Sequence, residues 1–132
     1  MVSDLFERLG RELGIRALID TFYDFMNELP EAVAIRKLHP DDLSESREKL
    51  YEFLTGWSGG PPLYTEKYGH PRLRMRHMPF PIGVAERDQW LLCMEKAFEK
   101  CQVDPEVQDF LRERFFQIAD FMRNKEEPAV NG

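Results

Sequence analysis

The sequence predicts an all-α fold, and two patterns carry that prediction. Apolar residues recur at intervals of three and four along most of the chain, which is the spacing of helices with one buried face. No segment shows the alternating apolar and polar residues of a half-buried strand. The size agrees, because 132 residues with 42% hydrophobic and 32% charged side chains suit one domain, 1–132, around one core.

The N-terminal part should form a short helix and then a long one. Ser3 and Asp4 can cap the short helix, and Gly10 stops it. An apolar stripe through residues 14–29 predicts the long helix, and Pro30 ends it because proline interrupts a helix.

A short turn, EAVAIRKL, should lead into the next helix. Asp41 and Asp42 place negative charge at the positive end of that helix, and the run of glycine and proline at 59–62 ends it. Residues 59–83 contain five prolines, four glycines and two of the three histidines, which leaves little room for a long helix. We expect an irregular but ordered segment there, of a kind that is usually functional.

Two more long helices are predicted in the C-terminal third. Gly83 can cap the first, with Glu86 at its third helical position. The second has a strong start signal in Asp104-Pro105-Glu106, where an aspartate caps and a proline occupies the first helical position. The chain should therefore contain four substantial helices and one irregular segment.

Charge and composition limit the classes of partner. The chain has 18 basic and 24 acidic residues, a net charge of −6, which argues against a nucleic-acid partner or an anionic membrane surface. No apolar run approaches the roughly 20 residues that a membrane span needs, and the N-terminus lacks a signal-peptide stretch. Two cysteines are too few for a disulfide framework. These observations predict a cytoplasmic protein without nucleic acid or membrane partners.

The two cysteines should not form a disulfide with each other. Cys93 and Cys101 are expected on one helix, where eight residues span about 12 Å, beyond the roughly 7 Å between alpha carbons that a disulfide allows. Cys101 lies on the apolar stripe and is expected in the core, whereas Cys93 is expected to be exposed.

His77 is the histidine whose neighbours suggest a ligand. It lies in RLRMRHMPFPI, next to Arg76 and near the apolar Met75 and Phe80. An imidazole between a guanidinium and an apolar wall suits a large flat ligand with anionic edges, such as haem, whose iron it could bind while the guanidinium meets a propionate. Zinc is a poorer match, because only His70 is near and no further ligand stands at a zinc spacing. The plain alternative is an ordinary surface or core histidine.

The segment GGPPLYTEKYGHPRLRMRHMPFPIGVAERDQWLLCM resembles the group II truncated haemoglobins, short two-over-two globins found mainly in bacteria and plants. The resemblance runs from FYDFM in the first long helix to the last helix. It is most specific in YGHPRLRMRHMPFPI and in the tryptophan of ERDQW. It implies a two-over-two helical sandwich around b-type haem, with a largely non-helical segment before the proximal histidine, in agreement with the irregular segment predicted above.

The resemblance also implies roles for individual residues. His77 matches the proximal ligand of haem iron, and His70 does not. Tyr23 and Trp90 match the distal tyrosine and tryptophan that donate hydrogen bonds to bound ligand, and His39 lies at the distal corner as a third contact. The plain alternative for Tyr23 and Trp90 is packing in the core. The other pocket residues implied are Phe22, Ser46, Lys49, Leu50, Phe53, Trp57, Tyr64, Met75, Arg76, Phe80 and Met94.

Polar positions at the edge of the implied pocket have specific expectations. Lys49, Tyr64 and Arg76 are plausible partners of the haem propionates, although exposed cations are often merely solvated. Ser46 occupies the distal-helix position where longer globins place a histidine. A small residue there leaves one side of the pocket open and supplies no strong base.

The expected function is reversible binding of dioxygen, nitric oxide, carbon monoxide or another small ligand at haem iron, trans to His77. Several donors should slow ligand escape, which suits scavenging or chemistry on the ligand better than bulk oxygen transport. The alternative is a haem enzyme for nitric-oxide dioxygenation or for peroxide or nitrite reduction, served by a reductase that the sequence does not identify. A haem-free helical interaction module is the third possibility. In the ferric form, Tyr23, His39 and water are all candidates for the sixth position.

Overall fold

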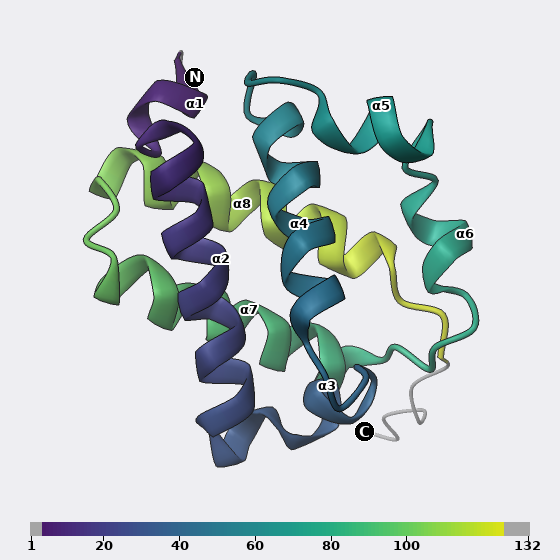
Figure 1. Cartoon of the computed structure of the whole chain (residues 1–132). Helices are drawn as coiled ribbons and strands as arrows, with labels where there is room; N and C mark the ends of the chain where they lie inside the picture. The colour runs from purple at the N-terminus through teal and green to yellow at the C-terminus, as the bar shows by residue number, and fades with distance from the viewer. Residues whose placement is uncertain (1–3, 126–132) are drawn as a thin grey trace.

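The computed structural model describes residues 4–125, and all of its regular elements within that range are helices (Figure 1). The all-α prediction is confirmed, and α2, α4, α7 and α8 are the four long helices. In chain order the elements are α1 (Leu5–Arg8), α2 (Arg11–Glu28), the 3-10 turn η1 (Pro30–Ala32), α3 (Val33–Lys37), α4 (Ser44–Trp57), α5 (Leu63–Tyr68), α6 (Leu73–His77), α7 (Val84–Lys100) and α8 (Pro105–Phe121).

The long helices form two layers. In Figure 1, α2 and α4 lie in front, and α7 and α8 cross behind them, while α5 and α6 occupy the right-hand edge. Helix α2 packs against both α4 and α7, and α7 packs against α8. This is a two-over-two arrangement, in which the short helices α5 and α6 close the side that the long helices leave open.

The core lies between these layers and is built from the stripes seen in the sequence. Ile15, Ile19 and Phe22 of α2 are completely buried, and Phe98 of α7 and Leu111 of α8 are buried against them. Burial of a large apolar side chain contributes about 1.5–3 kcal/mol, so this shared core ties the layers together.

Local capping signals explain where the last two helices begin. Glu86 Oε1 accepts a hydrogen bond from the backbone N–H of Gly83 at 2.7 Å, which starts α7 at the expected place. Asp104 Oδ1 accepts from the backbone N–H of Glu106 at 2.9 Å, which caps α8. Both predicted starts are confirmed, whereas Ser3 lies outside the described residues.

Two predicted irregular stretches contain helices. The turn after Pro30 is helical, as η1 and α3, because it is anchored by a contact distant in sequence: the backbone N–H of Ile35 donates to Gln89 Oε1 of α7 at 3.0 Å. The segment 59–83 contains α5 and α6, separated at Gly69, whose φ of 78° suits glycine. The prediction of no long helix there is confirmed.

The exposure predicted for Cys93 is wrong, and the burial predicted for Cys101 is confirmed in part. Cys93 is completely buried, because it lies beside Met94 on the face of α7 that packs into the core. Cys101 follows the last residue of α7, where the chain leaves the core, and is half-buried, with its Sγ 3.5 Å from Thr21 Oγ1.

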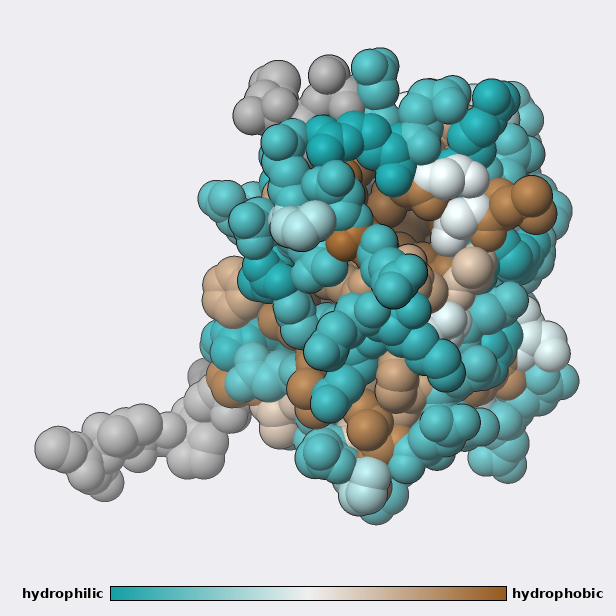
Figure 2. All heavy atoms as spheres, turned by 90° about the vertical axis from the view of Figure 1, so that its left-hand side faces the viewer, coloured by the Kyte–Doolittle hydropathy of each residue, from teal (hydrophilic) through white to brown (hydrophobic). Residues whose placement is uncertain are grey.

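The surface on the side of the N-terminal helices is largely hydrophilic. Figure 2 looks onto the left-hand side of Figure 1 and shows hydrophilic side chains over most of this face, with apolar ones in small separate areas. None of the helices between residues 4 and 125 is long and apolar enough to cross a membrane.

Gly14 provides a first prediction, because it marks a close approach between α2 and the turn before it. A Cβ at Gly14 would lie 1.9 Å from the carbonyl oxygen of Leu9. Gly14→Ala should lower the free energy of unfolding by about 1–3 kcal/mol, although alanine normally improves a helix interior by about 1 kcal/mol. Urea unfolding checks this, with Leu13→Ala as control, since Leu13 is 87% exposed. Stabilisation by Gly14→Ala would contradict the close approach.

Candidate functional site

A cavity of about 580 Å³ is lined by residues of every helix from α2 to α8. Pockets for small molecules and cofactors are typically about 300–1,000 Å³. Apolar side chains form a large part of its wall, as is usual for such a pocket, and polar and charged side chains also line it, among them Glu45, Glu86 and Arg87. The apolar side chains of the wall include Ile35, Leu38, Leu50, Phe53, Leu54, Leu73, Phe80, Ile82, Phe115, Ile118, Ala119 and Met122.

Most of the residues predicted for the pocket line this cavity. They come from five helices and two connecting segments, so that only the fold brings them together. They are Tyr23, His39, Ser46, Lys49, Leu50, Phe53, Tyr64, Arg76, His77, Phe80 and Trp90.

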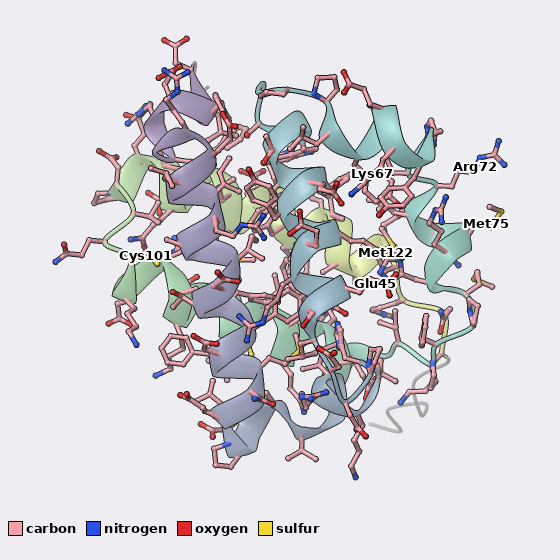
Figure 3. All side chains as sticks on the ribbon, viewed as in Figure 1. Glu45, Lys67, Arg72, Met75, Cys101 and Met122 are labelled. Carbon is pink, nitrogen blue, oxygen red and sulfur yellow. The ribbon has the colours of Figure 1, made fainter. Side chains whose placement is uncertain are left out.

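Four other predicted residues do not line the cavity. Phe22 is completely buried one layer behind it, against the ring of Tyr23, and Met94 is 1% exposed within the core. Trp57 packs against an aromatic ring of α8. Met75 is 58% exposed and in Figure 3 points away from the molecule, because α6 turns its other face inward. An apolar stripe does not distinguish cavity wall from core, and that ambiguity accounts for Phe22, Trp57 and Met94.

The imidazole of His77 is held in one orientation by its own helix. Its Nδ1 lies 2.6 Å from the carbonyl oxygen of Leu73, one turn earlier. A carbonyl oxygen can only accept, so Nδ1 carries a proton, and in the neutral imidazole Nε2 is then the nitrogen with the lone pair. A backbone carbonyl is a usual partner for the second nitrogen of a metal-binding histidine, so His77 presents the arrangement of a metal ligand.

A second histidine, His39, is arranged in the same way. Its Nδ1 lies 2.9 Å from the carbonyl oxygen of Ile35, so Nδ1 donates and Nε2 is again the free nitrogen. Burial lowers the pKa of His39, more than the hydrogen bond to the carbonyl raises it. The ring is therefore neutral near pH 7, and its Nε2 is an acceptor rather than a donor.

Tyr23 and Trp90 carry hydrogen-bond donors that no protein group satisfies. Within residues 4–125, neither the Tyr23 hydroxyl nor the Trp90 indole N–H has an acceptor, although both residues line the cavity. Tyr23 is buried and Trp90 is half-buried, and tyrosine and tryptophan donors in such places usually find a partner. Burial raises the pKa of Tyr23 well above its usual value, so its hydroxyl stays protonated. Two donors are thus available to a ligand inside an otherwise apolar cavity.

Both donors are fixed in place by ring packing. The Phe22 ring contacts Tyr23 with centroids 4.8 Å apart and Trp90 with centroids 5.0 Å apart. Trp90 is also packed edge-on against Phe115 at 5.7 Å. Such pairs contribute roughly 0.5–1.5 kcal/mol each beyond their buried area, so the two donors form a rigid group.

Cationic side chains stand at the edge of the cavity. Lys49 pairs with Glu45 at 2.8 Å, which raises the pKa of its ammonium group. The Nε of Arg76 donates to the carbonyl oxygen of Pro71 at 2.9 Å, and no carboxylate in residues 4–125 pairs with its guanidinium. Arg76 therefore leaves positive charge at the cavity that no described carboxylate balances, whereas the charge of Lys49 is balanced by Glu45.

Sequence reasoning missed the contribution of α8 to the cavity. Phe115, Ile118, Ala119 and Met122 form one wall. In the sequence these residues show only the apolar periodicity of a helix. That periodicity predicts a buried face but does not distinguish a face that packs in the core from one that lines a cavity. The contribution of Glu86 and Arg87 was missed as well, because charged residues at a helix start look like capping residues.

Asn124 was also missed, and it holds the segment that follows His77. Its side-chain Nδ2 donates to the carbonyl oxygens of His77 at 3.1 Å and Phe80 at 2.8 Å, and its Oδ1 accepts from the backbone N–H of Ile82 at 3.0 Å. Its own backbone N–H donates to the carbonyl oxygen of Ile82 at 2.9 Å. No local sequence pattern predicts these hydrogen bonds, because the partners of Asn124 are more than forty residues away in the sequence.

Known proteins resemble this chain in both sequence and fold. The profile of the bacterial-like globin family matches residues 4–124. The chain is 42% identical over 122 residues to group 2 truncated hemoglobin YjbI of Bacillus subtilis, covering 92% of this chain and 89% of that protein.

Two solved structures extend the resemblance to three dimensions. The group II 2-on-2 hemoglobin of Agrobacterium tumefaciens has a TM-score of 0.91 at 44% identity, covering 95% of this chain and 97% of that one. An oxygen-avid truncated haemoglobin of Bacillus subtilis has a TM-score of 0.84 at 40% identity, covering 92% of this chain and all of that one. The chain therefore belongs to the bacterial-like globin family and is a group II truncated haemoglobin.

Proposed function

We propose that Nε2 of His77 would hold b-type haem in this cavity and that the protein binds dioxygen, nitric oxide or carbon monoxide there. Family membership already implies haem-based ligand binding. The observation that carries the finer proposal is the set of free groups in one apolar cavity: an imidazole nitrogen with a lone pair and two donors without acceptors.

The residues of the cavity fit haem in three respects. Apolar side chains suit the porphyrin faces, the free nitrogen of His77 suits the iron, and Lys49 and Arg76 suit the propionates at the edge. Tyr64 lies at the same edge, 8% exposed, with a hydroxyl that can donate to a carboxylate. Bound haem would supply an iron centre that takes up a diatomic ligand.

Tyr23 and Trp90 then act on the ligand by donating hydrogen bonds. A diatomic ligand that carries partial negative charge is stabilised by fixed donors in a site of low polarity, where such bonds are stronger than in water. Because burial raises the pKa of Tyr23, its hydroxyl remains a donor at every pH near neutrality. The oxygen-avid character of the Bacillus subtilis relative supports slow release here too.

His39 can supply the third contact expected of it, as an acceptor. A neutral ring whose Nδ1–H is bound to a carbonyl presents only an acceptor to the cavity. It can accept a hydrogen bond from water or, when no ligand is bound, from the Tyr23 hydroxyl, and its ring already contacts the Tyr23 ring with centroids 5.8 Å apart. Because a hydroxyl has one proton, the Tyr23 hydroxyl donates either to His39 or to the ligand. His39 thus adds a contact to the cavity and no further donor.

An absorption spectrum tests the proposal directly. The purified chain, reconstituted with haem and reduced, should show a Soret band that shifts on addition of carbon monoxide and dioxygen. Absence of a Soret band after reconstitution would favour a haem-free helical interaction module instead.

Replacement of Asn124 should weaken haem retention without touching the cavity. Asn124→Ala removes three side-chain hydrogen bonds to the segment after His77. At about 0.5–1.5 kcal/mol for each bond, haem loss to an excess of acceptor apoglobin should accelerate by tenfold or more, since about 1.4 kcal/mol is a factor of ten. Asn27→Ala is the control, because Asn27 only accepts from Arg36 at the surface. Equal rates in both variants would contradict the role of Asn124.

A further inference from the structure

One segment of this acidic protein is strongly basic. Residues 67–85 contain no aspartate or glutamate but include Lys67, Arg72, Arg74 and Arg76, in a chain whose net charge is −6. Lys67 pairs with a buried glutamate, but within residues 4–125 no carboxylate pairs with any of the three arginines. All three are exposed, so α6 and the residue before it present uncompensated positive charge.

The neighbouring hydrogen bonds orient these guanidinium groups without neutralising them. Arg74 Nη1 donates to the carbonyl oxygens of Phe121 at 2.6 Å and Arg123 at 2.8 Å, and its guanidinium lies over the Phe121 ring at 5.5 Å. Arg76 Nε donates to the carbonyl oxygen of Pro71. Carbonyl oxygens carry no net charge, so the field of these arginines extends into solvent.

Apolar side chains are exposed among the arginines. Met75 is 58% exposed and Phe121 is 61% exposed, and Arg72, Arg114 and Phe121 line a shallow groove of about 510 Å³. We call Arg72, Arg74, Met75, Arg114 and Phe121 the α6 face. In Figure 3, Arg72 and Met75 both point outward from the molecule.

The composition of the α6 face is that of a protein contact. Exposed aromatic, methionine and arginine side chains are the types enriched where proteins meet. The opposite side of the molecule, which Figure 2 shows, is mostly hydrophilic. An acidic partner protein would be repelled by the net negative charge of the whole protein but attracted to the arginines of the α6 face. Electrostatic attraction would therefore direct such a partner to this face.

The α6 face is also separated from the cavity by a single short helix. Leu73 and His77 of α6 line the cavity, whereas Met75 of the same helix faces solvent. His77 Nδ1 is bound to the carbonyl oxygen of Leu73 at 2.6 Å, so a short path of covalent and hydrogen bonds leads from this backbone to the imidazole. The rate of electron transfer falls steeply with distance. A separation of one short helix between the α6 face and the cavity therefore favours electron transfer.

We propose that the α6 face is the docking site of a small acidic one-electron carrier protein that keeps the haem iron ferrous. The inference rests on the proposed function, because dioxygen binds the ferrous form. In the step, one electron leaves the carrier and reduces ferric iron to ferrous iron. The carrier is oxidised by one electron, and no bond in either protein is made or broken.

Stopped-flow reduction of the ferric haem protein by a reduced ferredoxin with an acidic surface tests this docking. The rate constant for the native chain should fall as salt is raised, since salt screens attraction between exposed charges. Arg72→Glu with Arg114→Glu should slow the reaction at low salt by about tenfold or more, within the range for electrostatic steering. Arg114→Glu alone should give part of this effect, and it avoids Arg72, whose φ of 46° complicates substitution.

The matched control makes the same change of net charge elsewhere. Lys96→Glu with Lys100→Glu alters exposed cations of α7, whose C-terminal end lies on the opposite side of the molecule from α6 (Figure 1). Reduction by ferredoxin should stay close to native in this control, and reduction by dithionite should be equal in all variants. Equal slowing by both double variants, or by neither, would overturn the α6 face as the docking site. A chain without a Soret band would instead overturn the proposed function, and this inference with it.

Discussion

Replacement of His77 by alanine should abolish normal haem ligation, because it removes the imidazole whose free nitrogen faces the cavity. Loss of a partner that merely orients a metal ligand costs about 10–100-fold in metal affinity. Loss of the ligand itself should cost more, so the variant should purify largely without haem or with an altered spectrum. Haem content per chain and the position of the Soret band measure the result.

His70→Ala is the matched control for this prediction. His70 lies outside the main cavity, in the shallow groove, and its Nδ1 accepts from the backbone N–H of Arg72 at 3.0 Å. The control should retain a native spectrum. Reversal of the two effects would overturn His77 as the proximal ligand.

The second cavity histidine adds a condition to the same experiment. His39 also presents a free Nε2 to the cavity, so it can take over as ligand when His77 is absent. Haem kept by His77→Ala but lost by His77→Ala with His39→Leu would identify that substitution of ligands. Haem kept by the double variant would show that neither histidine is required, which would contradict the proposal.

The sequence predicted those parts of the molecule that local rules determine. The start of α8 follows from Asp104 and Pro105, and the start of α7 from Gly83 and Glu86, because capping acts within a few residues. The contact from Ile35 to α7 is not visible in this way, so the sequence predicts only a short turn where the structure has η1 and α3.

The candidate site shows the same division between local and distant information. His77 stands out in sequence because Arg76 and apolar residues flank it, and the family resemblance added Tyr23 and Trp90. Periodicity could not separate cavity wall from core, as Phe22 shows. The hydrogen bonds of the Asn124 side chain join chain segments that meet only in the folded protein.

Removal of the Tyr23 hydroxyl should speed release of dioxygen from the ferrous protein. Tyr23→Phe deletes one donor and barely changes the volume of the side chain. A hydrogen bond to a charged acceptor is worth roughly 1.5–3 kcal/mol, or about one to two decades in rate at 1.4 kcal/mol per decade. Stopped-flow displacement of dioxygen by carbon monoxide gives the off-rate. Tyr51→Phe is the control, because Tyr51 is buried but does not line the cavity.

Trp90→Phe should also speed release, but its effect has two parts. It removes the indole donor, and it leaves a gap between Phe22 and Phe115, whose rings pack on either side. Because both donors face one ligand and both pack on the Phe22 ring, removal of one changes the surroundings of the other, and the single substitutions need not add. The double variant Tyr23→Phe with Trp90→Phe removes both donors and should therefore release dioxygen faster than either single variant. Off-rates that match the native protein in all three variants would show that the unpaired donors do not stabilise the ligand, and the hydrogen-bond part of the proposal would then fail even if His77 holds the haem.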